Sequence, residues 1–165
     1  MKRKAMKYQD YKSSRILVTG FPQFDFYSQK ERLLSREDFC KARGLDPKKK
    51  IILYGSAGGN DCWDDAGYLK LIRSFMEEGS LKDVQVLIRP HLGAKDDYKR
   101  FQEFENVLGF VVDRTDGQSN VFKDRGDYFT DDHINHLFNS LYHAVVCPNM
   151  VSTLTLDCLA VGTPV

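Results

Sequence analysis

The sequence predicts an α/β fold, a Rossmann-like parallel sheet with helices on both faces. Short apolar runs at residues 51–54 and 84–88 alternate with stretches whose apolar residues recur at helical spacing, which is the pattern of βαβ units. The run at 51–54 is apolar without interruption, as expected for a strand covered on both faces. At 165 residues, the chain is long enough for one hydrophobic core, so we expect a single domain.

The composition excludes several classes of protein. No apolar run approaches the roughly 20 residues that span a bilayer, and no signal-peptide core follows the N-terminal lysines, so we expect a cytoplasmic protein. The net charge of +1 creates no global field, so no nucleic-acid partner is expected. The four cysteines lack zinc-ligand spacing and are expected to be reduced and buried. We expect no cofactor and no metal.

The N-terminal third begins with a polar, lysine-rich stretch at residues 1–14, which we expect to be a tail or linker preceding a domain at 15–165. Residues 15–18 are predicted to form a short strand. Ser35 is a predicted N-cap, with Asp38 three residues later, for a helix that ends at Gly44.

The remaining elements continue the alternation. We predict, in chain order, a strand at 51–54, a glycine-rich turn at 55–59, a helix at about 64–78, a strand at 84–88, a helix at 96–104, a strand at 107–112 and an extended stretch near Tyr128. Thr130 is expected to cap a helix whose buried stripe consists of Ile134, Leu137, Phe138, Leu141 and Tyr142.

A strand at 144–147 and a final helix complete the pattern. Ser152 or Thr153 is expected to open that helix, which Gly162 ends, and its apolar residues are Leu154, Leu156, Leu159 and Ala160. The chain stops at Val165, where the pattern requires a further strand. We therefore expect a fragment of a longer protein, truncated at its C-terminus.

Ligands of an open parallel sheet bind beyond the carboxyl ends of its strands. After the first of these strands, Gly55, Ser56 and Gly58 could bring backbone N–H groups to a phosphate, or could form a flexible turn, since no dinucleotide or P-loop fingerprint is met. Arg89 and His91, after the next strand, suit a diphosphate. Alternatively, Arg89 pairs with a carboxylate such as that of Asp113, and His91 caps a turn.

The third candidate group lies at the start of the last helix. The hydroxyls of Ser152 and Thr153 and the free N–H groups of the first turn suit a phosphate, and Asp157, one turn deeper, could accept hydrogen bonds from ribose hydroxyls. Alternatively, the helix is merely capped and Asp157 is solvated. An aspartate among apolar residues favours burial, and a buried carboxylate needs partners.

A cluster of acidic residues and histidines suggests a metal site, but HExxH is absent and we predict a solvated helix face instead. The cluster consists of Asp131, Asp132, His133, His136 and His143. No nucleophile motif such as GxSxG supports hydrolysis.

The segment 142–165 resembles the closing βα unit of GT-B fold transferases, in which a serine-rich turn precedes a helix that carries an acidic residue and ends in A-x-G-x-P-V. It is most similar to CDP-glycerol glycerophosphotransferases and surface-polysaccharide glycosyltransferases, with UDP-N-acetylglucosamine 2-epimerases as structural relatives. Residues 19–25 are similar to the G-x-P-x-x-D segment of these families, and residues 88–91 to their basic segment.

The resemblance implies one half of a GT-B fold, in which Asp157 would hold the donor ribose and Ser152 and Thr153 the diphosphate. Arg89 and His91 would lie nearby, the turn at 55–59 would line the floor, and His91 is the candidate catalytic residue. Aspartate rather than glutamate at position 157 favours the glycerophosphotransferases.

The implied function is donor binding in a transferase that moves a sugar or glycerol phosphate from a nucleotide-activated donor, of the CDP-glycerol or UDP-sugar class, to a cell-surface polymer. The acceptor site would come from a missing N-terminal domain, so this chain alone is expected to be inactive and its parent enzyme to associate peripherally with the membrane. Two alternatives remain open, a non-catalytic nucleotide- or protein-binding module and half of an epimerase-like enzyme.

Overall fold

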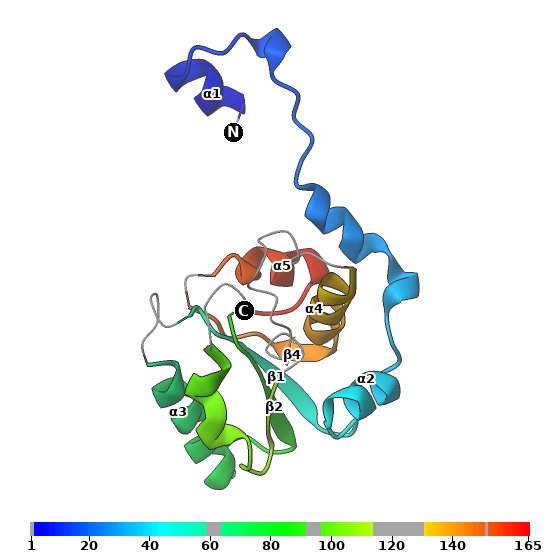
Figure 1. Ribbon diagram of the computed structural model, residues 1–165, viewed down its shortest axis with the longest axis vertical. Helices are drawn as coiled ribbons and strands as arrows, with labels where there is room; N and C mark the ends of the chain where they lie inside the picture. Colours follow the sequence, from blue (N-terminus) through cyan, green and yellow to red (C-terminus); the bar gives the residue numbers. More distant parts are fainter. Residues whose placement is uncertain (1, 59–63, 92–96, 114–130, 151) are drawn as a thin grey trace.

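The computed structural model describes residues 2–58, 64–91, 97–113, 131–150 and 152–165 (Figure 1). Its centre is an all-parallel sheet with the strand order β3-β2-β1-β4. The strands are β1 (Lys50–Gly55), β2 (Val84–Arg89), β3 (Phe110–Val112) and β4 (Ala144–Val146). The fold is therefore α/β and Rossmann-like, which confirms the predicted class.

The strand order creates a switch point beside β1. From β1 the chain proceeds outward through β2 to β3, and α4 (Asp131–His143) then precedes a return to β4 on the other side of β1. In doubly wound sheets, ligands bind where the strand order reverses, outside the carboxyl ends of the strands. The fold thus directs attention to the ends of β1 and β4.

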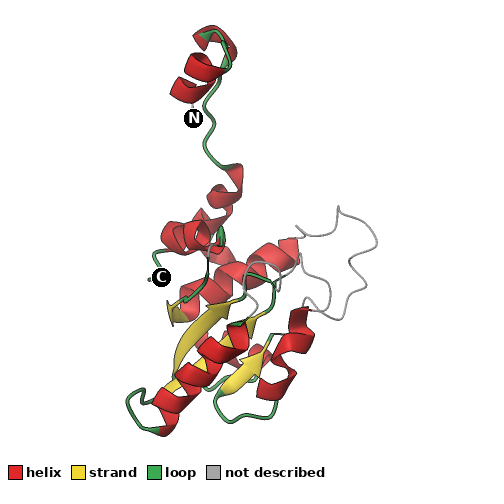
Figure 2. Ribbon diagram, turned by 90° about the vertical axis from the view of Figure 1, so that its left-hand side faces the viewer, coloured by secondary structure: helices red, strands yellow, loops and turns green. Residues whose placement is uncertain are grey.

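Helices cover both faces of the sheet (Figure 2). Alternate residues of the central strands face opposite sides, as strand geometry requires. Ile51, Leu53 and Leu87 pack in one core with α2 (Arg36–Arg43), α4 and α5 (Leu154–Val161). Ile52 and Val86 pack in the other with α3 (Asp65–Glu77) and the 3₁₀ helix η4 (Asp97–Phe104).

The first twenty residues extend away from this body (Figure 1). They contain α1 (Lys2–Tyr8) and the 3₁₀ turn η1 (Ser13–Arg15), and none of residues 2–20 is buried. The predicted strand at 15–18 is wrong. Its apolar residues have no neighbouring strand to pair with, and Leu17 is 85% exposed.

Two further 3₁₀ helices, η2 (Pro22–Ser28) and η3 (Lys30–Arg32), pack against α4. The Tyr27 ring lies 5.3 Å from the Phe138 ring. Asn139 holds the end of this segment, because its Oδ1 accepts from the N–H of Leu34 (2.7 Å) and its Nδ2 donates to the carbonyl of Arg32 (3.2 Å). The segment is therefore fixed to α4 at residues 32–34.

Most predicted helix ends are confirmed. The hydroxyl of Ser35 accepts from the N–H of Asp38, and Gly44 ends α2 with a left-handed backbone (φ 69°). The strand predicted at 107–112 begins only at Phe110, because a turn at Gly109 (φ 85°) precedes it. The predictions for Gly59, Asp96, Tyr128 and Thr130 lie outside the described residues.

The predicted stripe of α4 is only partly correct. Phe138 and Leu141 are buried, but Tyr142 is exposed, and the polar side chains of Asn139 and Ser140 are buried instead. In the described part of the chain, no helix combines the length and apolar character that crossing a membrane requires.

Candidate functional site

The segments that follow the strands meet at the carboxyl edge of the sheet. The N–H of Gly55 donates to the carbonyl of Pro148 (3.1 Å), and the N–H of Ser56 to the carbonyl of Arg89 (3.0 Å). The N–H of Asp113 donates to the carbonyl of Ile88 (2.8 Å). The candidate residues after β1 and β2 therefore lie at one edge.

The glycine-rich turn is packed closely within the chain. A Cβ atom at Gly55 would overlap the side chain of Leu154, so glycine allows α5 to approach β1. Gly58 has a positive φ of 85°, and its N–H donates to the Ser56 hydroxyl (3.0 Å). The N–H groups of Gly55, Ser56 and Gly58 thus have partners within the chain.

The side chain of Ser56 belongs to a buried network around Asp65, in the first turn of α3. Asp65 accepts from Tyr54 (2.8 Å), Ser56 (2.9 Å) and Arg100 (3.0 Å). Arg100 also pairs with Asp97 (2.8 Å). This network ties β1, α3 and η4 together.

Arg89 lies at the centre of a second buried cluster. Its Nη1 lies 3.5 Å from Asp113 Oδ2 and 2.9 Å from His136 Nδ1. His136 Nε2 lies 3.2 Å from the same Asp113 oxygen, and Arg43 lies 3.6 Å from Asp113 Oδ1. The alternative prediction that Arg89 pairs with Asp113 is confirmed.

His136 contradicts the prediction of a solvated helix face, because only 7% of it is exposed. A guanidinium can only donate, so Nδ1 accepts from Arg89 and the imidazole is neutral, with its proton on Nε2 beside Asp113. Burial and the charges of Arg89 and Arg43 hold the pKa of His136 well below its ordinary value, against the opposing effect of Asp113.

Asp157 is buried, 9% exposed, in the first turn of α5. Its Oδ1 accepts a hydrogen bond from the Tyr27 hydroxyl (2.8 Å), which reaches across from η2. Burial raises the pKa of the Asp157 carboxyl, while hydrogen bonds from Tyr27 and Gln23 and the charge of Arg89 act in the opposite direction. The same charge acts on Tyr27. Arg89 and Asp157 are therefore electrostatic neighbours, although their strand and helix are far apart in sequence.

Ser152 and Thr153 lie where α5 begins. The hydroxyl of Ser152 accepts from the N–H of Leu154 (3.2 Å), whereas the exposed Thr153 makes no side-chain cap to the helix. Asn149 fixes this helix end to β4, because it accepts from Thr155 (3.0 Å) and donates to the carbonyl of Cys147 (3.1 Å).

His91 is exposed at the end of β2, and its backbone N–H donates to Asp97 (2.8 Å). Asp97 and Ser56 belong to the α3 and η4 side of the sheet, whereas Asp157 lies on the other side, with α4 and α5. The candidate residues are thus divided between two faces.

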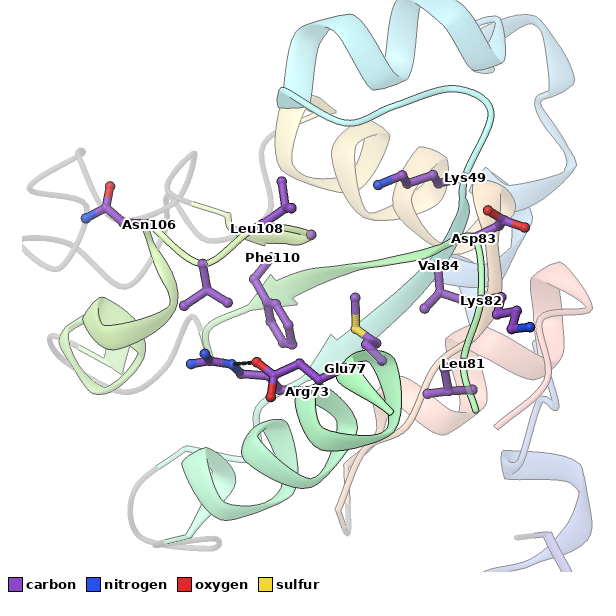
Figure 3. A pocket seen from close by; sticks show the side chains of 13 residues that line it. Lys49, Arg73, Glu77, Leu81, Lys82, Asp83, Val84, Asn106, Leu108 and Phe110 are labelled. Carbon is purple, nitrogen blue, oxygen red and sulfur yellow. Dashed lines mark hydrogen bonds and ion pairs between the residues drawn. The ribbon is translucent and has the colours of Figure 1, made fainter. Parts of the chain in front are cut away.

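A pocket of about 640 Å³ opens at the opposite, amino end of β2 and β3 (Figure 3). Its charged residues Arg73 and Glu77 bind each other (2.6 Å), and Leu108 on its rim is 92% exposed. Ligands of parallel sheets bind at the carboxyl ends, so we do not assign a function to this pocket.

Sequence reasoning missed Tyr27, Gln23, Asp65 and His136 as partners at this edge. The short 3₁₀ segment that carries Tyr27 has no clear periodicity, and it lies 130 residues from Asp157. Among the described residues, no group of three or more histidines, cysteines and carboxylates is placed to hold a metal ion. No family model, curated protein or solved structure matches the chain.

Proposed function

We propose that this chain is the donor-binding domain of a GT-B transferase, and that it binds a nucleoside diphosphate donor of the CDP-glycerol or UDP-sugar class at the carboxyl ends of β1 and β4. The observation that carries the proposal is the Asp157 carboxyl, buried in the first turn of α5, whose pKa the charge of Arg89 acts to lower. A carboxylate can accept from ribose hydroxyls, and a nearby guanidinium can compensate phosphate charge.

The binding mode follows from these groups. Ribose would hydrogen-bond to Asp157, and the diphosphate would lie at the start of α5, where Thr153 makes no cap and the helix dipole favours negative charge. During transfer, these groups would stabilise the charge of the departing nucleotide electrostatically. His91 remains the candidate for proton transfer, because its side chain is exposed at this edge.

Titration with nucleotides tests this proposal. CDP-glycerol, CMP, UDP-N-acetylglucosamine, UDP and GDP would be titrated into the protein by calorimetry or NMR, with pyrophosphate as a control for plain phosphate binding. Saturable binding of one nucleotide that Asp157→Asn weakens about tenfold or more is expected, since hydrogen bonds to a charged group contribute roughly 1.5–3 kcal/mol.

The matched control is Asp132→Asn, an exposed carboxylate on α4 that should leave the affinity unchanged. Asparagine is preferred to alanine at position 157 because it retains an acceptor for Tyr27. Equal binding of nucleotide by Asp157→Asn and the wild type would contradict the assignment.

A second candidate function, a protein-binding module, is favoured by the exposed apolar face of α5. Leu156 and Leu159 are 45% and 68% exposed, and Val145 of the edge strand β4 is also exposed. Apolar residues exposed together often mark a contact surface. Concentration-dependent sedimentation that Leu159→Glu abolishes would show that this face is a contact surface, as a transferase half without its other domain would also expose. A stable monomer that binds no nucleotide would favour the module.

A further inference from the structure

Asp157 in this structure is already engaged by the chain itself. The phenol of Tyr27 donates to its Oδ1 at 2.8 Å, and Tyr27 belongs to η2. The side chain of Gln23, four positions earlier in the same helix, acts to lower the pKa of this carboxyl. One short segment therefore supplies a donor to a buried acceptor.

The vicinal hydroxyls of a ribose would present the same chemistry. They offer two O–H donors side by side, and a carboxylate can accept both. Tyr27 thus occupies hydrogen-bonding capacity that a ribose would need at Asp157. A ribonucleotide and η2 would be alternatives for one carboxylate rather than simultaneous partners.

η2 has few buried contacts. None of its residues is fully buried, and none of residues 2–20 before it is buried. Its contacts include the hydrogen bond of Tyr27 to Asp157, ring contacts of Phe26 and Tyr27 with Phe138 at 6.3 and 5.3 Å, and the packing of the partly buried Tyr27 against the core that contains Leu141 and Cys158. Segments with few buried contacts open at a low free-energy cost.

We propose that η2 is an intramolecular competitor for the donor site, and that a ligand gains access to Asp157 only when ribose hydroxyls replace the hydrogen bond of Tyr27. This inference rests on the proposed function, and it adds regulation and sugar selectivity to it. A ligand without these hydroxyls would leave a buried carboxylate without its partner, which is unfavourable.

Binding of CMP and UMP, and of their 2′-deoxy counterparts, to wild-type protein and Tyr27→Phe tests the proposal. The apparent affinity of a site that is only partly open is reduced by the open fraction. Removing the phenol should raise that fraction, so Tyr27→Phe is expected to bind the ribonucleotide roughly fivefold to tenfold more tightly. Phenylalanine keeps the ring that packs on Phe138, so the fold should persist.

The matched control is Tyr68→Phe, which removes a hydroxyl from α3 on the other face of the sheet and should leave the affinity unchanged. The wild-type protein should also prefer the ribonucleotide to its deoxy counterpart by roughly tenfold. In the NMR spectrum, a saturating ribonucleotide should shift the ring signals of Tyr27, whereas pyrophosphate should not.

The outcomes separate the two proposals. Ribonucleotide binding that Tyr27→Phe leaves unchanged or weakens would overturn competition and leave the donor site standing, with Tyr27 as a fixed support of Asp157. Equal binding of ribo- and deoxyribonucleotides would overturn the replacement of the Tyr27 hydrogen bond by ribose hydroxyls. If neither folded protein binds CMP or UMP, the proposed function and the competition both fail.

Discussion

Asp65 and Asp157 are both buried carboxylates in the first turn of a helix at the carboxyl edge of the sheet, but their hydrogen-bond donors come from different parts of the chain. The donors to Asp65 are residues of the body, Tyr54, Ser56 and Arg100. The donor to Asp157 is Tyr27, in a segment without fully buried residues. The two carboxylates are therefore alike in burial and in having hydrogen-bond donors, and they differ in how firmly those donors are attached to the rest of the chain.

The largest expected effect is on Asp65. Asp65→Ala removes the acceptor of three side chains and leaves the Arg100 guanidinium without this partner, so we expect the free energy of unfolding to fall by about 3 kcal/mol. Urea denaturation followed by circular dichroism measures it. A loss no larger than that of Asp157→Asn would remove the distinction between the two carboxylates.

Asp157→Asn is expected to change the free energy of unfolding by less than about 1 kcal/mol. Burial raises the pKa of Asp157, so the folded chain binds this proton more tightly than the unfolded chain does. The ionised carboxyl therefore lowers stability as the pH rises through its folded-state pKa, and asparagine avoids that cost while it keeps an acceptor for Tyr27. A loss above about 2 kcal/mol would assign Asp157 a structural role.

The buried side chain of His136 extends the comparison to a titratable group whose neighbours Arg89 and Asp113 lie at the ends of strands of the sheet. Because the pKa of His136 is lowered in the folded chain, the unfolded chain takes up this proton first as the pH falls below about 6.5. We expect the free energy of unfolding to fall by about 2 kcal/mol as the pH is lowered from 7 to 5, because only the unfolded chain binds the His136 proton in this range. Urea denaturation at several pH values measures it.

The matched variant for this pH dependence is His136→Asn, whose side chain can still accept from Arg89. It should flatten the profile and leave only the smaller contribution of His143, whose pKa is also lowered, mainly by burial. An unchanged slope in this variant would mean that His136 is protonated in the folded chain.

The smallest expected effect is that of Tyr27→Phe on stability. Only the hydroxyl is lost and Asp157 can recruit water once η2 loosens, so we expect a decrease of about 1 kcal/mol in the free energy of unfolding. Thermal unfolding measures it, with Tyr68→Phe as the reference. A decrease as large as that of Asp65→Ala would show that η2 is a structural part of the body.

The fold was predictable because local signals and the sheet agree. The apolar run at 51–54 forms a central strand. The hydroxyl of Ser35 caps the start of α2 and the left-handed backbone of Gly44 ends it, as both residue types favour. The prediction of a strand at 15–18 failed, because β-type residues form a strand only where a neighbouring strand pairs with them, and the local sequence does not specify that neighbour.

The candidate site was predictable only in part, for the same reason. The burial of Asp157 followed from its apolar sequence neighbours, and the pairing of Arg89 with Asp113 from their positions after adjacent strands. The Tyr27 contact depends on how the N-terminal segment packs over α4 and α5, and the burial of His136 depends on its contacts with Arg89 and Asp113 at the ends of β2 and β3. No periodicity encodes such long-range packing.

The hydrogen bonds of Asn139 to the backbone of Arg32 and Leu34 fix the chain just after η2, and so limit how far Tyr27 could move from Asp157. Tyr27 lies five positions before Arg32, so a released phenol would remain on a short tether beside Asp157. Short flexible tethers correspond to effective concentrations on the order of millimolar. If the chain binds a nucleotide at Asp157 as proposed, that nucleotide would compete with a phenol held at a constant, high local concentration.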